Sequence, residues 1–431
     1  MNRLLAFAFV LAAALPPAAA LASNCNGTQT GLVPLTAPGF GTYQGYPGGL
    51  YPGGANTRPP AHEASGIAIA NSIAPLDTFG NASASGRIVF VSIGMSNCTQ
   101  EFSTFVPMAN ADPYRDPGVL VVDCAVGGQT ASIIKNPAAP YWSVVQARLT
   151  TRGASLPQVQ VVWLKEANAG PTTGFPAATL TLMADLGSVV RTIKDKMPNA
   201  SIVYLSSRTY GGYASTPLNP EPYAYESGFA VKWLIEAQIA GEDSLEFDPG
   251  QGPVEAPWLS WGPYLWADGQ NPRPGDGLTW ACSDFVSNDG THPSATGRAK
   301  VADMLFQFLH IDATAQPWYL NYTVGAPSPG LNPMPPLALA PNPAAGQVAL
   351  SFGTAPGERW TLEVLDLAGR RVRDLAHGVG DGSTRTMFWD ARDLHGARAR
   401  PGIYWVRLTH GARAVTRRLA LLGPGDGRHA W

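Results

Sequence analysis

Short apolar runs alternate with longer amphipathic runs between residues 87 and 310. The short runs are continuous and rich in β-branched side chains, which is typical of parallel strands buried on both faces. We expect strands at 87–93, 118–123, 159–164 and 201–205, and helices at 140–150, 177–196, 223–240 and 293–310. The pattern therefore predicts an α/β domain of three layers, a parallel sheet with helices on both faces.

The last quarter of the chain has a different pattern. Short runs that alternate apolar and polar residues are separated by glycines, and they predict a small β-sandwich over 347–431. Its expected strands are 348–352, 360–367, 386–390, 402–409 and 414–422. Before it, residues 323–346 are dense in Pro, Gly and Ala and have neither period, as in a linker. We thus expect two domains, 23–322 and 347–431.

Charge and composition narrow the class of protein. The 431 residues are 45% hydrophobic, which excludes wholesale disorder and a membrane protein of many helices. The net charge of −2 hides an asymmetry, because residues 338–431 hold 13 Arg and no Lys against 8 acidic residues. The near-neutral total offers no cationic face for phosphates, so we expect no nucleic-acid partner.

The first residues resemble a signal peptide in their order of charge and hydropathy. A cationic start, Met1-Asn2-Arg3, precedes an apolar stretch over 4–15 and a small-residue cleavage site, Ala20-Leu21-Ala22. We expect a signal peptide over 1–22, with an uncleaved anchor as the alternative. No other segment reaches 18 apolar residues, so we expect no transmembrane segment and a protein that is secreted, held at the cell surface or periplasmic.

Four cysteines, Cys25, Cys98, Cys124 and Cys282, permit one or two disulfides in an exported chain. They allow three full pairings, between which the sequence cannot choose. No Cys-x-x-Cys pair is present, so their spacing does not suit a zinc site.

Polar residues follow several expected strands and precede the last helix. They are Gly94-Met95-Ser96-Asn97, Gly127-Gly128-Gln129-Thr130, Lys165-Glu166-Ala167-Asn168 and Asp289-Gly290-Thr291-His292-Pro293. Ligands of open α/β sheets bind beyond the carboxyl ends of the strands, so we expect these clusters to converge in one crevice. Each cluster alone has a simpler interpretation as a turn, a helix cap or a surface side chain.

The order and positions of the four clusters resemble the SGNH or GDSL hydrolases over about residues 85–310. Asp289-x-x-His292-Pro293 before a helix is the most telling piece. The resemblance implies a three-layer, flavodoxin-like α/β/α fold and a serine esterase that acts on carboxylic esters without metal or cofactor.

Specific roles follow from the resemblance. Ser96 matches the nucleophile, His292 the general base and Asp289 the carboxylate that orients the imidazole, while the Ser96 amide, Gly128 and Asn168 match the oxyanion hole. The chemistry requires these residue types, because a serine hydroxyl needs an adjacent base and the tetrahedral oxyanion needs preorganised donors.

The clusters also depart from the family pattern. Met95 stands where an Asp precedes the nucleophile, and Glu166 and Ala169 replace the outer residues of the third block. These departures favour a competing hypothesis, an inactive surface protein that binds glycans on the same fold. Lys165 and Glu166 near the expected crevice are candidates for binding substrate, and a local ion pair is the interpretation that we favour.

Aromatic residues gather in a loop-like segment before the histidine block. Trp258, Trp261 and Trp266 are candidate substrate-binding residues, since indole faces stack on sugar rings. They suggest an esterase that deacetylates carbohydrates, and the alternative is that they pack as a satellite core. In the strand order usual for this family, Cys98 and Cys124 would follow adjacent strands, which makes a bridge between them one candidate pairing.

The C-terminal segment resembles the Ig-like domain of flagellar hook-capping proteins and the C-terminal sorting domains of type IX secretion. The similarity is carried by Pro341-Asn342-Pro343, residues 364–370 and Pro401-Gly402-Ile403-Tyr404. It implies a bacterial module for secretion or cell-surface attachment without catalysis, with the secretion machinery as partner. A structural appendage or a sugar-binding domain is the alternative.

Overall fold

The chain divides into two compact units, residues 1–321 and 322–431, which are described separately. A computed structural model describes residues 22–321, 337–344, 346–354, 357–366, 370–410 and 413–422. The expected signal peptide, except its last residue, lies outside the described residues, as do residues 323–336 and 345 of the expected linker.

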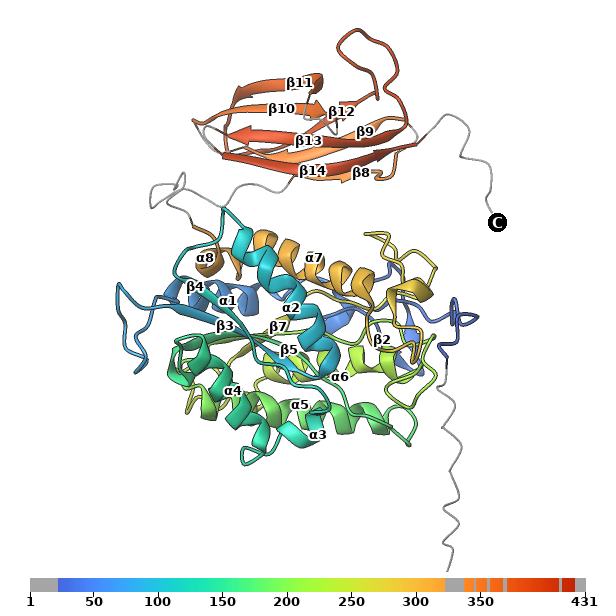
Figure 1. Ribbon diagram of the computed structural model, residues 1–431. Helices are drawn as coiled ribbons and strands as arrows, with labels where there is room; N and C mark the ends of the chain where they lie inside the picture. Colours follow the sequence, from blue (N-terminus) through green and yellow to red (C-terminus); the bar gives the residue numbers. More distant parts are fainter. Residues whose placement is uncertain are drawn as a thin grey trace, which may run out of the picture. The chain divides into compact units, whose positions relative to one another are not determined.

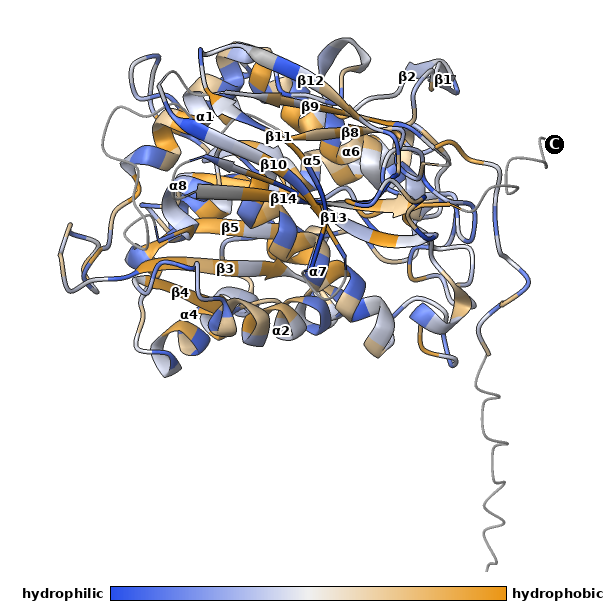
Figure 2. Ribbon diagram, turned by 90° about the horizontal axis from the view of Figure 1, so that it is seen from above, coloured by the Kyte–Doolittle hydropathy of each residue, from blue (hydrophilic) through white to orange (hydrophobic). Residues whose placement is uncertain are grey.

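The first unit is built on a five-stranded, wholly parallel sheet. Its order is β4 (Val119–Asp123), β3 (Ile88–Gly94), β5 (Val159–Lys165), β6 (Ile202–Leu205) and β7 (Trp258–Trp261). Every residue of β3, β5, β6 and β7 is buried, and Figure 2 shows hydrophobic colouring along β3, β4 and β5. Burial on both faces explains why these strands read as unbroken apolar runs.

Helices pack on both sides of this sheet. They are α1 (Pro60–Ser72), α2 (Ser96–Ala111), α3 (Ala131–Ile134), α4 (Pro140–Thr151), α5 (Ala177–Lys196), α6 (Tyr223–Ile239), α7 (Ala295–Ile311) and α8 (Gln316–Tyr319). In Figure 1, α7 and α8 lie above the sheet and α3, α4 and α5 below it. Helix α2 packs against α7, and α5 packs against α6. Two-residue strands β1 (Thr42–Tyr43) and β2 (Tyr46–Pro47) and four short 3₁₀ turns complete the unit.

The expected elements between residues 87 and 310 are present, with bounds that differ by two residues at most. The fifth strand, β7, lies in the segment that we expected to be a loop. Its four residues include two tryptophans, and so short an apolar run carries no periodicity that distinguishes a strand. Helix α1 was not predicted either, because it lies in a lead-in that is rich in Pro and Gly.

The second unit consists of two antiparallel sheets. One has the order β11 (Arg371–Val379), β10 (Arg359–Leu365), β13 (Gly402–His410) and β14 (Arg413–Leu421), and the other the order β12 (Thr384–Trp389), β9 (Val348–Gly353) and β8 (Ala338–Ala340). A separate apolar core, which includes Leu350, Val364, Trp389 and Val406, belongs to this unit. Strand β8 lies within the expected linker, and β11 was not predicted because its polar and charged residues hide the alternation.

The structure pairs Cys25 with Cys282 across 257 residues of sequence. Cys98 and Cys124 are buried and not bridged, so the candidate pairing between them is wrong. The Cys98 thiol of α2 instead lies 3.6 Å from the carbonyl oxygen of Ile93, near the end of the preceding strand β3. The observed bridge ties the N-terminal segment to the 3₁₀ turn Cys282–Asp284, shortly before the histidine block.

Candidate active site

Three side chains from two distant parts of the chain meet in a hydrogen-bonded row. The Ser96 Oγ lies 2.7 Å from His292 Nε2, and His292 Nδ1 lies 2.6 Å from Asp289 Oδ2. An ionised Asp289 accepts a hydrogen bond from Nδ1–H, which leaves Nε2 to accept from the serine hydroxyl. The structure thus brings together the three residues expected to form the triad, in the geometry of a nucleophile, a base and an orienting carboxylate.

The loop that carries Asp289 and His292 fixes their relative position. Asp289 Oδ1 accepts hydrogen bonds from the backbone N–H groups of Thr291 (2.8 Å) and His292 (3.0 Å). Burial raises the pKa of Asp289, but the bonds from the His292 side chain and from these backbone groups outweigh it and lower the pKa below its usual value. Gly290, which lies between Asp289 and Thr291, has a φ of +63°. A Cβ at this position would lie 1.9 Å from the Tyr213 carbonyl oxygen. Glycine is therefore required at this turn.

The nucleophile occupies the first turn of α2. Ser96 is the first helical residue, and Met95 is the extended residue that caps the helix. The backbone N–H groups at a helix start have no partner within the helix, and the positive end of the helix dipole lies there. The Ser96 N–H is therefore available to an anion that forms beside the hydroxyl.

The second expected oxyanion element is a tight turn beside Ser96. The Gln129 N–H donates to the Val126 carbonyl (3.3 Å), with Gly127 and Gly128 between them, and Gly128 has a φ of +75°. A Cβ on Gly127 would lie 3.6 Å from the Ser96 Cβ, so the turn packs directly against the nucleophile. Neither the Gly127 nor the Gly128 N–H donates to an acceptor among the described residues, so both are free to face a ligand.

The third element, Asn168, is held on both ends of its side chain. Its Oδ1 accepts from the Ser132 N–H (2.9 Å), and its Nδ2 donates to Asp185 Oδ2 (2.7 Å). The Ala131 N–H also donates to the Ala167 carbonyl (3.2 Å), so the second and third loops lie side by side. The Ser132 and Asp185 contacts could not be foreseen from the sequence, because both partners are distant along the chain.

Buried charges lie behind these loops. Lys165 Nζ contacts the carboxylate of Glu101 at 2.6 and 2.5 Å, and both side chains are 1% exposed. The expected ion pair between Lys165 and Glu166 is thus wrong, since adjacent residues of a strand end point to opposite faces. Burial raises the pKa of Glu166 well above its usual value, which favours the neutral carboxyl.

Arg208 is a further buried cation that sequence analysis missed. It follows β6 and is 5% exposed, and its guanidinium Nε has no hydrogen-bond partner among the described residues. The nearby carboxyls of Glu101, Glu221 and Asp289 all accept hydrogen bonds from other groups. Burial is the main influence on Arg208 and lowers its pKa.

The tryptophans expected to bind substrate are core residues. Trp258, Trp261 and Trp266 are 0%, 2% and 0% exposed, and each indole N–H donates to an internal acceptor. No ring face is left for a sugar, so their assignment as substrate-binding residues is wrong. The reason is that Trp258 and Trp261 form the ends of β7, a strand at the edge of the sheet of which every residue is buried.

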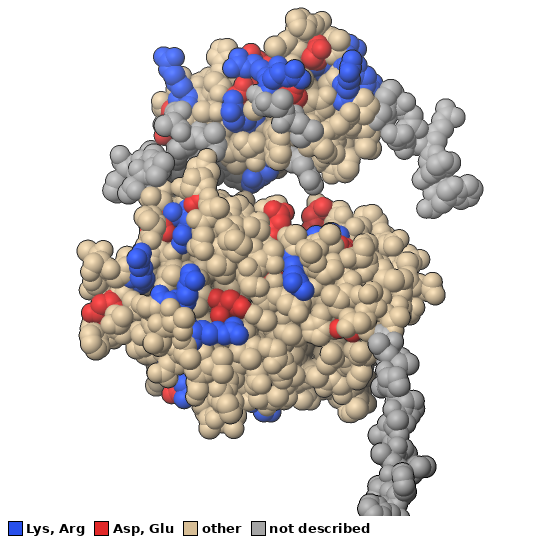
Figure 3. Space-filling view, in the orientation of Figure 1, with Lys and Arg blue, Asp and Glu red and all other residues tan. Residues whose placement is uncertain are grey.

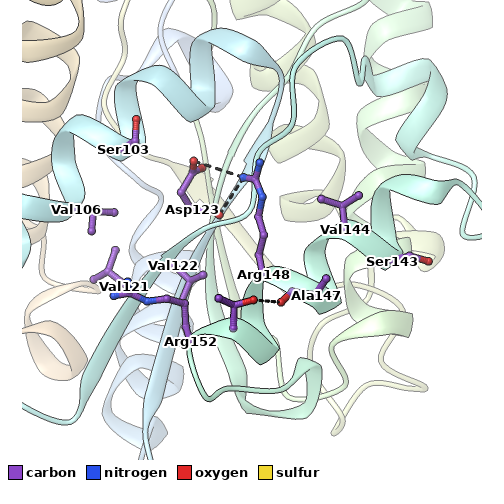
Figure 4. A pocket seen from close by; sticks show the side chains of 11 residues that line it. Ser103, Val106, Val121, Val122, Asp123, Ser143, Val144, Ala147, Arg148 and Arg152 are labelled. Carbon is purple, nitrogen blue, oxygen red and sulfur yellow. Dashed lines mark hydrogen bonds and ion pairs between the residues drawn. The ribbon is translucent and has the colours of Figure 1, made fainter.

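A surface cavity of about 590 Å³ lies elsewhere in the unit, along β4 and between α2 and α4 (Figure 4). Val106, Val121, Val122 and Val144 are among its apolar lining residues. The Arg148 guanidinium reaches Asp123 at its edge. The cavity includes none of the triad residues, and nothing connects it to the chemistry described above.

Within the described parts of the chain, no three or more His, Cys, Asp or Glu side chains are grouped so as to hold a metal ion. No helix in those same parts has the length and apolar character needed to cross a bilayer.

Residues 338–421 match the family of secretion system C-terminal sorting domains. This range covers β8 to β14, that is, the whole of the second unit's two sheets. The match supports the expected resemblance to type IX sorting domains and indicates an exported protein.

Three solved structures illustrate the structural similarities. PorU from Porphyromonas gingivalis is 19% identical, with 22% of this chain and 10% of that chain covered and a TM-score of 0.19. FlgD from Xanthomonas campestris is 20% identical, with 20% and 63% covered and a TM-score of 0.16. The periplasmic domain of a Salmonella ser. Paratyphi A lipopolysaccharide acetyltransferase is 12% identical, with 52% and 83% covered and a TM-score of 0.28.

This chain therefore spans about a tenth of the length of PorU and less than two thirds of FlgD. No curated protein matched it in sequence. At these identities and TM-scores the similar structures carry no argument about activity, so the first unit is interpreted from its own geometry. The family match concerns the second unit alone, whose residues 338–421 match the secretion system C-terminal sorting domains.

Proposed function

We propose that the first unit is a serine esterase with the SGNH type of α/β fold, and that it hydrolyses carboxylic esters through Ser96, His292 and Asp289. The observation that carries the proposal is the continuous hydrogen-bonded row from Ser96 Oγ through the imidazole to Asp289, with distances of 2.7 and 2.6 Å. Two available glycine N–H groups beside Ser96 support it further.

The reaction follows from this geometry. His292 Nε2 takes the hydroxyl proton as Ser96 Oγ bonds to the ester carbonyl carbon, and the carbonyl electron pair moves onto oxygen. The Ser96 N–H, the glycine turn and Asn168 would donate to that oxyanion. Its collapse breaks the ester C–O bond, and the alcohol leaves with the proton from Nε2. Water then attacks the acyl-serine carbonyl and gives a proton to His292 Nε2. Collapse of the second tetrahedral intermediate breaks the bond between the acyl carbon and Ser96 Oγ, which takes the proton back from Nε2 as the acid leaves.

The substrate class is a carboxylic ester, and an acetylated carbohydrate is one candidate within it. Burial of Trp258, Trp261 and Trp266 removes the aromatic platform that first suggested a sugar. The sorting domain favours a substrate that the protein encounters after export. We propose that the secretion machinery recognises this domain and releases the protein or attaches it at the cell surface.

Turnover of p-nitrophenyl acetate and labelling with a fluorophosphonate test the proposal. We expect the wild type to do both and Ser96→Ala to do neither, with a loss in kcat of about 10³-fold or more. Ser103→Ala is the matched control, since Ser103 is exposed on the same helix and should behave as wild type. An inactive, unlabelled wild type would refute the esterase and favour the competing glycan-binding protein, which a glycan array would then examine.

A further inference from the structure

Asp185 of α5 receives hydrogen bonds from two of the loops that surround the nucleophile. Asn168 Nδ2 lies 2.7 Å from its Oδ2, and Lys135 Nζ lies 2.6 Å from its Oδ1. Asp185 is 5% exposed, so its carboxylate has little access to water and each oxygen has a protein partner instead. A buried carboxylate is costly unless it is paired and hydrogen-bonded in this way.

These contacts close a ring with the loop that follows the glycine turn. Asn168 Oδ1 accepts from the N–H of Ser132 in α3, and Lys135 is the residue that ends α3. The Thr192 hydroxyl, about two turns further along α5, donates to the Lys135 carbonyl (3.1 Å). We call Ser132, Lys135, Asn168 and Asp185 the Asn168 brace.

The brace determines how the amide of Asn168 is oriented. An asparagine side chain can exchange its oxygen and nitrogen by a flip, but here a donor faces the oxygen and a carboxylate faces the nitrogen. One N–H of the amide is thereby occupied and the other is left for a ligand. The residue after Asn168 is Ala169, whose side chain cannot hydrogen-bond to the Asn168 amide. The carboxylate that orients this amide therefore comes from α5.

We propose that Asp185 is a positioning residue: it holds the Asn168 amide so that its remaining N–H is preorganised toward the reaction oxyanion, and Lys135 fixes Asp185 in turn. This inference rests on the proposed esterase function. Preorganisation matters because a donor that must reorient during the reaction loses much of its electrostatic benefit. A negatively charged acceptor also polarises the amide and strengthens its second N–H.

Kinetics of p-nitrophenyl acetate hydrolysis by the full-length protein test the role. We expect Asp185→Ala to lower kcat about 10- to 100-fold with KM little changed, because the oxyanion exists only in the transition state. Asp185→Asn keeps one acceptor oxygen, so its kcat should lie between those of Asp185→Ala and the wild type. Asp195→Asn, an exposed carboxyl on the same helix, is the matched control and should retain the wild-type kcat.

A double-mutant cycle separates positioning from a general structural effect. If Asp185 acts through Asn168, then Asp185→Ala should cost nothing further in an Asn168→Ala background. Losses that add, a wild-type kcat for Asp185→Ala, or a wild-type kcat for Asn168→Ala would each overturn the proposal.

A second readout does not require activity. With ¹⁵N-labelled asparagine, the Asn168 side-chain resonance, assigned by its loss in Asn168→Ala, should shift in Asp185→Ala and in Lys135→Met but not in Asp195→Asn. An unshifted resonance in Asp185→Ala would overturn the brace. If the resonance shifts but the wild type has no turnover, the esterase fails and, with it, the catalytic role of the brace.

Discussion

The two units of this protein treat buried charge in different ways. The first unit buries the ionisable side chains of Glu101, Lys165, Glu166 and Arg208. In the second unit the buried carboxylate of Glu363 is met by arginines that reach in from solvent. Figure 3 shows Lys and Arg gathered on the visible face of the second unit and few charges on that of the first.

The difference is consistent with the proposed division into a catalytic first unit and a second unit that is recognised. Burying charges lowers stability unless each is paired, so a fold that retains several of them in one place invites a functional explanation. In the first unit Lys165, Glu166 and Arg208 lie at or after the ends of β5 and β6, and Glu101 lies on α2, the helix that begins at Ser96. The second unit has an apolar core and an Arg-rich surface, as suits a module that another protein recognises.

The largest effect that would sharpen this comparison is expected from Asp289→Asn. The variant keeps the shape of the side chain but presents an amide to His292 Nδ1, which favours the wrong imidazole tautomer. We expect kcat for p-nitrophenyl acetate to fall about 10³- to 10⁴-fold with little change in the melting temperature.

Asp303→Asn is the control for that measurement, since Asp303 is exposed on α7 and its carboxylate accepts a hydrogen bond from the nearby Gln307 (2.7 Å). Near-wild-type activity of Asp289→Asn would show that the buried charges of the first unit serve no Ser-His-Asp chemistry.

The three residues of the hydrogen-bonded row could be selected from the sequence because their signals are local. Asp289 and His292 are three residues apart before a helix, and Ser96 follows a strand whose apolar run is unmistakable. The strands β3 to β6 and the helices α4 to α7 were predicted for the same reason, because periodicity is a property of neighbouring residues.

The rest of the site depends on contacts that local patterns do not encode. Asp185 meets Asn168 over 17 residues, and Lys165 meets Glu101 over 64. Trp266 was wrongly assigned to substrate binding, because the sequence does not distinguish an indole that stacks on a sugar from one that donates to a buried carboxylate. The disulfide joins cysteines 257 residues apart, a choice that only the fold makes.

A smaller effect should appear in the pH dependence of stability through Glu221. Burial is the main cause that raises the pKa of this carboxyl, to about 7. Because the native state then binds a proton that the unfolded state releases near pH 4.5, the free energy of unfolding should decrease between pH 4.5 and 8. The decrease is on the order of 3 kcal/mol.

Urea unfolding of Glu221→Gln at both pH values tests this expectation. The variant cannot titrate, so it should lack that decrease, although the loss of one acceptor for the Tyr225 N–H (3.0 Å) adds an offset independent of pH. Exposed Glu242→Gln should follow the wild type. If the free energy of unfolding depends on pH equally in Glu221→Gln and the wild type, burial of Glu221 does not lower the stability of the first unit at high pH.

The smallest effect is expected from the corresponding carboxylate of the second unit. Glu363 Oε1 accepts from Arg407 (2.8 Å) and Oε2 from Arg371 (3.0 Å), whose side chains are 42% and 56% exposed. In Glu363→Ala both guanidinium groups can turn into water, so no buried charge is left unpaired. We therefore expect a loss of about 1 kcal/mol in the unfolding of the second unit, reduced further by salt.

Asp374→Ala provides the reference for this last variant, since Asp374 is 58% exposed and lies 3.3 Å from the same Arg371. Its effect on thermal unfolding should be close to zero. If Glu363→Ala costs as much as 3 kcal/mol, the arginines depend on their partner as much as buried cations do. The second unit would then depend on buried charged groups as the first does. The burial of charge would no longer distinguish the proposed catalytic unit from the unit proposed to be recognised.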